Sequence, residues 1–402
     1  MRDRLLTGLG PNVIVLGLVS LFTDISSEMI YPLIPLFLVS VLGASYVDVG
    51  TIEGIAESTA SILNVFSGWL SDRWGRRKPI TVVGYGVSAL AKPLLALTSS
   101  WPQVLVTRFL DRFGKGVRTA ARDALIAESS DERWLGKAFG FHRAADTIGA
   151  VVGPLLASVF IALSFGFRDI FLIAFVPALI GVVLILLFVR EAPHPSPQAE
   201  ESLRQARLNP TYLNARFKTY LLVLAIFAIG NSSDVFIILR AQNVGVPLVI
   251  IPLLYVAMNL VYALVSFPAG MLSDRVGRRP IILSGYLIFA LTYAGFAFVS
   301  NVTQMWALIA LYGVYNGFTE AAAKAYAADL SEGAHLGTYF GFYNSVIGVF
   351  ALPASIIAGL LWMVFGAPSV FIYGTSTAFI ALVLLLVAPA VLARYERRRN
   401  EV

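Results

Sequence analysis

Two short basic stretches of this chain are nearly identical. Gly68 to Pro79 reads GWLSDRWGRRKP, and Gly270 to Pro280 reads GMLSDRVGRRP. The second begins 202 residues after the first, and each lies between long apolar runs. Repetition of one phrase in such matched surroundings indicates an internal duplication.

The composition is that of a membrane protein. Of the 402 residues, 57% are hydrophobic and 13% are charged, with a mean hydropathy of +0.77, whereas soluble domains carry about 25% charged residues. The basic residues, which give a net charge of +6, lie mostly in short segments between apolar runs. We therefore attribute them to membrane topology and expect no nucleic-acid partner. The chain has no cysteine and three scattered histidines, so we expect no metal site and no cofactor.

Cutting the chain at its polar and Gly/Pro positions leaves runs of about 20 residues or more, the length that crosses a hydrocarbon core. These twelve predicted spans lie near 11–39, 47–70, 79–99, 102–126, 135–163, 168–190, 217–240, 247–271, 280–300, 303–328, 336–364 and 368–393. The first run is too long for a signal peptide and lacks a cleavage site, so we expect it to remain. The predicted fold class is an all-α integral membrane protein with twelve transmembrane helices in two six-helix bundles.

Lysine and arginine are distributed unevenly between the two sides of such a bundle. The segments on the side of the two termini hold 20 of them, whereas the opposite loops hold only Arg168. Because cytoplasmic loops retain basic residues, we expect both termini and both copies of the basic phrase in the cytoplasm. The predicted location is a plasma membrane or bacterial inner membrane.

Further segments repeat between the halves. Ser26-Ser27-Glu28 lies in the first predicted span and Ser232-Ser233-Asp234 in the seventh, while GKAFGFH at 136–142 and GTYFGFY at 337–343 begin the fifth and eleventh. We predict one bundle at 1–190, a cytoplasmic linker at 191–216 and a second bundle at 217–402. Two parallel repeats of this kind create a cleft near the membrane midplane.

The repeated phrase resembles the loop signature G-x-L-x-D-R-x-G-R-R/K of the major facilitator superfamily (MFS) of secondary transporters, in particular the twelve-helix drug or metabolite:proton antiporters. The matching residues are Gly68, Leu70, Asp72, Arg73, Gly75, Arg76 and Arg77, then Gly270, Leu272, Asp274, Arg275, Gly277, Arg278 and Arg279. The resemblance implies a conformational latch, in which the loop arginines pair with an acid near the end of span four. Asp123 is the candidate for that acid, and Asp72 and Arg76 are expected to pair across the halves or with span four.

Two further motifs resemble the same family. Arg112-Phe-Gly-Lys115-Gly116 is similar to the R-x-x-Q-G signature of span four, with lysine where glutamine is usual. Gly149-Ala-Val-Val-Gly153-Pro154 is similar to the G-x-x-x-G-P motif of proton-coupled exporters. A Gly-x-x-x-Gly pair is also an ordinary helix-packing motif, so both interpretations stay open.

Ionisable residues inside the predicted spans are functional candidates because burying them in a bilayer is costly. Those of span four are Arg108, Asp111, Arg112, Lys115, Arg118, Arg122 and Asp123. At 100° per residue they fall within about 140° of one helical face. In span one, Asp24, Glu28 and Tyr31 share a face, and Pro32 and Pro35 are expected to bend the helix just beyond them.

The candidate residues for substrate binding and proton coupling lie mainly on spans one, four, five, seven and ten. They are Asp24, Glu28, Tyr31, Arg108, Asp111, Arg112, Lys115, His142, Arg143, Asp146, Asp234, Asn259, Asn316, Glu320 and Lys324. The alternative is a structural ion-pair network, because seven basic residues meet seven acidic ones in the first half.

We hypothesise that Asp24 or Glu28 lies near Arg112 or Lys115 and takes up a proton when the cation turns to the substrate. His142 and Asp146, spaced i and i+4, form either a second proton relay or a helix-end hydrogen bond.

The sequence predicts a secondary active transporter and not an enzyme, since it contains no Gly-x-Ser-x-Gly elbow and no phosphate-binding glycine loop. We expect a monomer that exports a small organic solute in exchange for protons by alternating access, with the proton gradient as its energy source. The alternatives are import, export of a charged metabolite or metal chelate bound by the span-four cations, or a sensor that keeps the fold without transport.

Overall fold

The computed structural model describes residues 9–74, 76–191, 213–331 and 336–400. Within these ranges the secondary structure is helical, without strands. The first half of the chain forms the helices α2 (Pro11–Ile30), η1 (Tyr31–Leu33), α3 (Ile34–Ser40), α4 (Tyr46–Trp74), α5 (Arg77–Ala96), α6 (Trp101–Glu128), η2 (Glu132–Trp134), α7 (Leu135–Ala162) and α8 (Phe167–Phe188).

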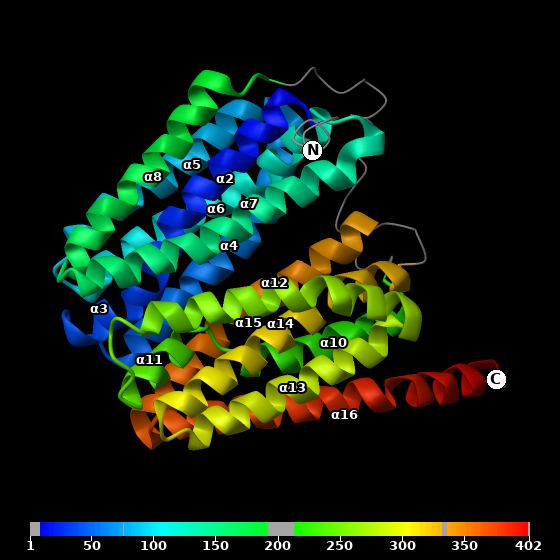
Figure 1. Cartoon of the computed structure of the whole chain (residues 1–402). Coiled ribbons are helices and arrows are strands. Elements are labelled where there is room, and N and C mark those ends of the chain that lie inside the picture. Colours follow the sequence, from blue (N-terminus) through cyan, green and yellow to red (C-terminus); the bar gives the residue numbers. More distant parts are fainter. Residues whose placement is uncertain (1–8, 75, 192–212, 332–335, 401–402) are drawn as a thin grey trace. The chain divides into compact units, whose positions relative to one another are not determined.

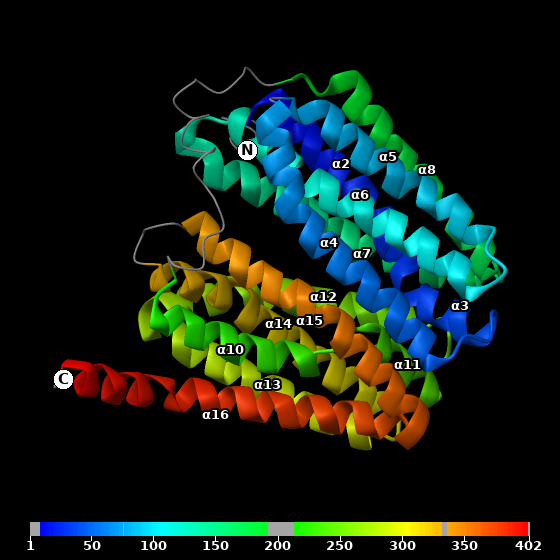
Figure 2. The same ribbon diagram turned by 180° about the vertical axis from the view of Figure 1, so that it is seen from behind.

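The second half repeats this succession of long helices (Figures 1 and 2). Its helices are α10 (Ala215–Gly230), α11 (Val235–Asn243), α12 (Ile251–Val276), α13 (Arg278–Phe298), α14 (Val302–Leu330), α15 (Leu336–Phe365) and α16 (Ala367–Asn400). Each predicted span corresponds to one long helix or to one interrupted pair, so the predicted fold class is confirmed. The chain is a multi-pass membrane protein.

Among the described residues, nine segments are long and apolar enough to cross a membrane by length and composition alone. The three remaining predicted spans correspond to α4, α6 and α14. Helix α6 is not among the nine because its charged face lowers its mean hydropathy, although the helix is long enough to span a membrane. A span with such a face must pack it against other polar groups or line water.

Two spans are interrupted. In the first, the 3₁₀ turn η1 separates α2 from α3, with Pro32 and Pro35 at the starts of the new segments, because proline cannot supply the interior hydrogen bond of a helix. This agrees with the expected bend. In the seventh, four residues from Asn231 to Asp234 are not helical and separate α10 from α11. The run of apolar residues on either side predicted one continuous span here, so this break is a new feature of the structure.

The chain divides into two compact units. One comprises Met1–Ala44, Ile55–Leu203 and Pro247–Val256, and the other Ser45–Gly54, Arg204–Val246 and Ala257–Val402. The predicted bundle boundaries at 190 and 217 stay a prediction, and the predicted linker at 191–216 lies mostly outside the described residues.

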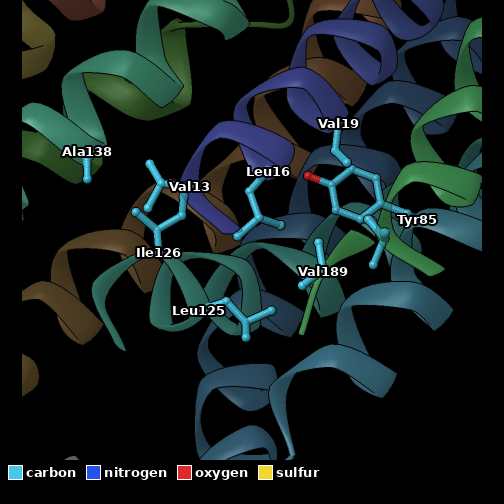
Figure 3. Packing of buried hydrophobic residues seen from close by; sticks show 9 residues of the cluster. Val13, Leu16, Val19, Tyr85, Leu125, Ile126, Ala138 and Val189 are labelled. Atoms are coloured by element: carbon cyan, nitrogen blue, oxygen red, sulfur yellow. The ribbon is translucent and has the colours of Figure 1, made fainter. Parts of the chain in front are cut away.

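The core of the first unit is apolar at the end where α2 begins. The buried cluster consists of Val13, Leu16, Val19, Tyr85, Leu125, Ile126, Ala138, Ile185 and Val189. Figure 3 shows these side chains converging from α2, α5, α6, α7 and the end of α8. Close packing of this kind stabilises a helix bundle in lipid through van der Waals contact.

An arginine covers the C-terminal end of the third span in each bundle. Arg168 donates to the carbonyl oxygens of Ala96 and Thr98 at 3.1 and 2.7 Å. Arg240 donates to Phe296 and Ala297 carbonyls at 3.0 and 3.1 Å. The last carbonyls of a helix have no intrahelical partner, so a cation placed there satisfies them and complements the helix dipole.

Candidate functional site

Helix α6 turns most of its charged side chains into the first unit. Arg108, Asp111, Arg112 and Arg118 are buried, whereas Lys115 is exposed. Removing a charged group from water costs on the order of several kcal/mol per ion. A buried charge is therefore tolerated when ion pairs and hydrogen bonds offset that desolvation cost. The partners of each charge therefore separate structural pairs from groups that are available for function.

Asp111 is fully engaged by neighbouring groups. Lys92 Nζ lies 2.6 Å from Asp111 Oδ1, and Arg108 lies 3.4 Å from its other oxygen. Ser88 Oγ also donates to Asp111 at 2.6 Å. Since Ser88 and Lys92 belong to α5, this cluster joins α5 to α6 and resembles a structural ion pair.

Arg112 is held between an acid and an aromatic ring. Its guanidinium lies 3.1 Å from Glu57 of α4. The same group lies 5.8 Å from the centre of the Tyr31 ring, and that of Arg108 lies 5.9 Å from it. A guanidinium at this distance from an aromatic face gains cation–π stabilisation. The predicted residues Tyr31, Arg108 and Arg112 are thus close together, and Glu57 is an acid that the predicted site did not include.

Asp24, Glu28 and Lys115 differ from these paired groups. In the described part of the chain no salt bridge joins them to any residue, and Glu28 Oε2 is buried without a hydrogen-bond partner. Lys115 and Arg112 are nevertheless the cations that interact most strongly with the Glu28 carboxylate. The structure therefore places two carboxylates and an ammonium group within electrostatic range of one another and outside direct ion pairs.

Helix α7 packs its glycines onto α2 beside these carboxylates. A Cβ atom on Gly149 would lie 2.8 Å from Asp24 Cβ, and one on Gly153 would lie 2.6 Å from the Ile25 carbonyl. Only a residue without a side chain allows this approach. Pro154 follows in the same buried stretch of α7, so the Gly-x-x-x-Gly-Pro motif forms the contact between the two helices.

A short polar chain lies one turn nearer the start of α7. Ser20 Oγ donates to Asp146, and His142 Nδ1 lies 3.6 Å from Asp146 Oδ2. His142 is buried, and its Nε2 atom has no hydrogen-bond partner among the described residues. Arg143, on the adjacent side of α7, is exposed. The structure thus brings His142 and Asp146 together, while Arg143 remains close enough to interact electrostatically with His142.

The second copy of the basic phrase forms ion pairs at the end of α14. Arg278 pairs with Asp274 of the same phrase, and its Nε lies 3.6 Å from Asp329 in the last turn of α14. Gly277 has a φ of 93°, a conformation that favours glycine. Of the other residues of this copy, Arg275 is exposed and Gly270 is half-buried. An arginine of this copy thus meets an acid at the end of span ten.

In the first copy of the basic phrase, an arginine also pairs with an acid at the end of α6, but this acid is not the predicted Asp123. Arg77 Nε lies 3.2 Å from Glu128, in the last turn of α6. Asp123, the predicted partner, instead pairs with Arg122 at 2.8 Å, while Arg76 is exposed at the start of α5. The surroundings of Gly68, the side chains of Asp72 and Arg73, and all of Gly75 lie outside what the structure describes.

The predicted residues of the second bundle form two separate groups. Tyr312 donates to Asp234 at 2.6 Å, next to the break in span seven. Glu320 accepts a hydrogen bond from Tyr262 and lies 3.4 Å from Lys324. The remaining two, Asn259 and Asn316, are half-buried on α12 and α14.

Sequence reasoning missed Glu128, Arg118 as an aromatic contact, and the break in span seven. The Arg118 guanidinium lies 4.2 Å from the centre of the Tyr85 ring. The sequence signal for the break is the pair Gly230-Asn231, because both residues are poor helix formers.

A sequence model described as Major Facilitator Superfamily matches residues 16–258 and 221–401. An uncharacterized MFS-type transporter of Methanocaldococcus jannaschii is 39% identical over 94% of this chain and 95% of its own length. The multidrug resistance protein MdtG of Citrobacter koseri is 27% identical over 76% of this chain and 77% of its own length.

Solved structures of transporters share the fold. That of the nucleoside transporter NupG (D323A mutant) has a TM-score of 0.79 at 12% identity and covers 93% of this chain and 99% of that one. A POT family transporter in complex with 5-aminolevulinic acid has a TM-score of 0.78 at 14% identity and covers 95% and 97%. At these identities the likeness concerns the fold.

Proposed function

Since the chain belongs to the Major Facilitator Superfamily, it is a transporter of small molecules and not an enzyme, and we propose that it exports a small organic solute in exchange for protons. Both termini lie in the cytoplasm of a plasma or bacterial inner membrane in this proposal, and the monomer is the working unit. A multidrug resistance protein among the relatives supports efflux of organic compounds.

The observation that carries proton coupling is the contrast between paired and unpaired charges in the first bundle. Asp111 has Lys92, Arg108 and Ser88 around it. Asp24 and Glu28 have no salt bridge within the described residues, although Lys115 interacts electrostatically with both. Ionisable groups kept inside a span without a direct ion pair are costly to bury, which makes them functional candidates.

The coupling follows from the movement of one cation between two partners. A carboxylate beside a cation is stabilised in its ionised form, and it takes up a proton when that cation leaves. If Lys115 turns from Glu28 toward another acid while no substrate is bound, the carboxylate takes up a proton. A substrate whose positive or hydrogen-bond-donating group binds Glu28 favours the ionised carboxylate and displaces that proton, so proton binding and substrate binding alternate at one place.

The exposed ammonium of Lys115 also favours a second candidate function, the transport of an anionic metabolite or metal chelate. In that case Lys115 is a direct ligand of the cargo, and the neighbouring Arg112, which interacts with it electrostatically, strengthens the anion site. The direction of transport does not follow from this charge.

The proposal is tested by a ligand screen followed by a flux measurement. Thermal shift of the purified protein at two pH values against organic cations and anions identifies a substrate through the stabilisation that a ligand gives to the folded state. Proteoliposomes loaded with a pH-sensitive dye then report proton movement when that substrate is added. Substrate transport without any proton movement would contradict the coupling, and a cationic substrate would contradict the anion alternative.

A further inference from the structure

The break in span seven interrupts the helical hydrogen bonding of the backbone inside the second unit. α10 ends at Gly230 and α11 begins at Val235, although 215–243 is one membrane-spanning segment by hydropathy. Irregular backbone at this depth is tolerated where protein or water satisfies its polar groups. Interrupted helices in transporters place free carbonyl groups and helix ends where ions bind.

The packing of the second unit keeps this segment in place. A Cβ atom on Gly230 would overlap the side chain of Thr377 on α16, so glycine is required where α10 ends. The Asn231 amide donates to the Tyr315 hydroxyl at 3.3 Å, and the Ser233 backbone N–H donates to Ser355 at 3.4 Å. The break is thus anchored by α14, α15 and α16.

Three oxygen atoms at the break are buried without a hydrogen-bond partner in the described part of the chain. They are Asn231 Oδ1, Ser232 Oγ and Tyr293 Oη. Ser232 is 5% exposed and Tyr293 is fully buried. Leaving a buried polar atom unsatisfied destabilises the folded state, and native structures contain few such atoms without a water or an ion to explain them.

The groups at the break are linked to one carboxylate. The Tyr293 hydroxyl interacts with Ser232, Tyr312 and Asp234. Asn231 donates to Tyr315, which also interacts with Asp234. Tyr312, itself buried, donates to Asp234 Oδ1 at 2.6 Å. None of the described hydrogen bonds is accepted by the backbone carbonyl of Asn231 or Ser232. Hydroxyl and amide oxygens and the Asp234 carboxylate therefore belong to one cluster of interacting groups at the break.

We propose that this cluster, formed by Asn231, Ser232, Asp234, Tyr293 and Tyr312, binds a sodium ion. Hard cations take carboxylate, carbonyl and hydroxyl oxygens as ligands. One carboxylate balances one positive charge, which fits a monovalent ion better than a divalent one. Among the described residues no three His, Cys, Asp or Glu side chains form a metal cluster. An alkali ion does not need one, because neutral oxygens supply the rest of its shell.

The site goes beyond the proposed proton coupling, since its residues belong to the second unit, whereas Asp24, Glu28 and Lys115 belong to the first. The test measures thermal unfolding of the purified full chain in rising NaCl, compared with choline chloride at equal ionic strength. A bound ion stabilises the folded state with saturation. We expect the melting temperature to rise by a few degrees with Na⁺ and to remain level with choline.

Three variants assign that response to the cluster. Tyr293→Phe and Ser232→Ala each remove one hydroxyl and are expected to weaken the apparent Na⁺ affinity several-fold, and Asp234→Asn is expected to abolish the response. Tyr286→Phe is the matched control, since it removes a hydroxyl two turns away on the same helix, and its Na⁺ response should equal that of the parent.

Two results would overturn the assignment. Identical melting curves in NaCl and choline chloride would mean that ordered water alone satisfies these oxygens. A sodium response that persists unchanged in Tyr293→Phe and Ser232→Ala would place the ion elsewhere. The two hydroxyl variants keep the test decisive even if Asp234→Asn fails to fold.

Discussion

The two bundles carry the same Ser-Ser-acid phrase in different conformations. Ser26-Ser27-Glu28 lies within the uninterrupted helix α2, whereas Ser232-Ser233-Asp234 lies in the break between α10 and α11. Ser26 Oγ donates to the Ala174 carbonyl at 2.6 Å, whereas Ser232 Oγ is buried without a partner in the described residues. The two residues before each phrase differ, with Asp24-Ile25 in one copy and Gly230-Asn231 in the other.

The fourth and tenth spans, α6 and α14, differ in the kind of polar side chain that they bury. α6 holds buried charges in ion pairs with α4 and α5. In α14 the buried polar groups are tyrosines such as Tyr312 and Tyr315, while the side chains of Glu320 and Lys324 are 43% and 52% exposed. Duplication has therefore preserved the order of the helices, and local substitutions have given charge pairs to one bundle and hydroxyl groups to the other.

The largest expected effect concerns the paired acid of the first bundle. Asp111→Ala removes the carboxylate that pairs with the buried Lys92 ammonium and one of the partners of Arg108, and removal of one partner from a buried pair costs about 3–5 kcal/mol. We expect a large fall in the melting temperature of the purified protein. The double variant K92M/D111L, which removes both charges, should recover most of the loss. A single variant that melts like the parent would mean that the cluster is not a structural pair.

The contact between α2 and α7 comes next. In Gly153→Ala the new methyl group would lie 2.6 Å from the Ile25 carbonyl and 2.8 Å from the Met29 nitrogen, so the helices must separate, at a cost of about 1–3 kcal/mol. Gly140→Ala is the matched control on the same helix, because no atom lies within 4 Å of its added methyl group. Equal thermal stability of the two variants would argue against close α2–α7 packing.

The two copies of the loop pair should differ in strength. Arg77 and Glu128 have side chains 6% and 23% exposed, whereas Arg278 and Asp329 are 25% and 57% exposed. Partly buried charged hydrogen bonds contribute about 1.5–3 kcal/mol, and exposed pairs about 0–1 kcal/mol. Arg77→Gln is therefore expected to lower the melting temperature more than Arg278→Gln does. The opposite order would show that the second copy is the stronger contact.

The smallest effect lies in the exposed turn between α6 and α7. Hydrogen bonds from the Arg133 backbone and side chain lower the pKa of Asp131 below its ordinary value of 3.8. The ionised form is therefore favoured on folding, so its contribution to stability is present above about pH 4 and is lost as the pH falls further. The melting-temperature gap between the parent and Asp131→Asn should narrow as the pH is lowered from 6 to 3. A gap that widens on acidification would contradict this sign.

The sequence predicts the spans well because the length of an apolar run is set by the bilayer. It also predicts the charged face of α6, which follows from helical spacing. It does not predict which charges pair. Asp123 pairs with its neighbour Arg122, and Arg77 pairs with Glu128, because side-chain geometry decides among several nearby acids. The break at Asn231 was missed because a hydropathy window averages Asn-Ser-Ser-Asp with the apolar residues around it.

The most direct test of the account is transport by Asp24→Asn and Glu28→Gln in proteoliposomes. We predict that each variant still exchanges labelled for unlabelled substrate at equal pH, while its pH-gradient-driven accumulation falls at least about tenfold. Asp131→Asn, in the exposed turn, is the control and should keep both activities. Full accumulation by Asp24→Asn and by Glu28→Gln would contradict the central claim that the unpaired carboxylates of the first bundle couple proton movement to transport.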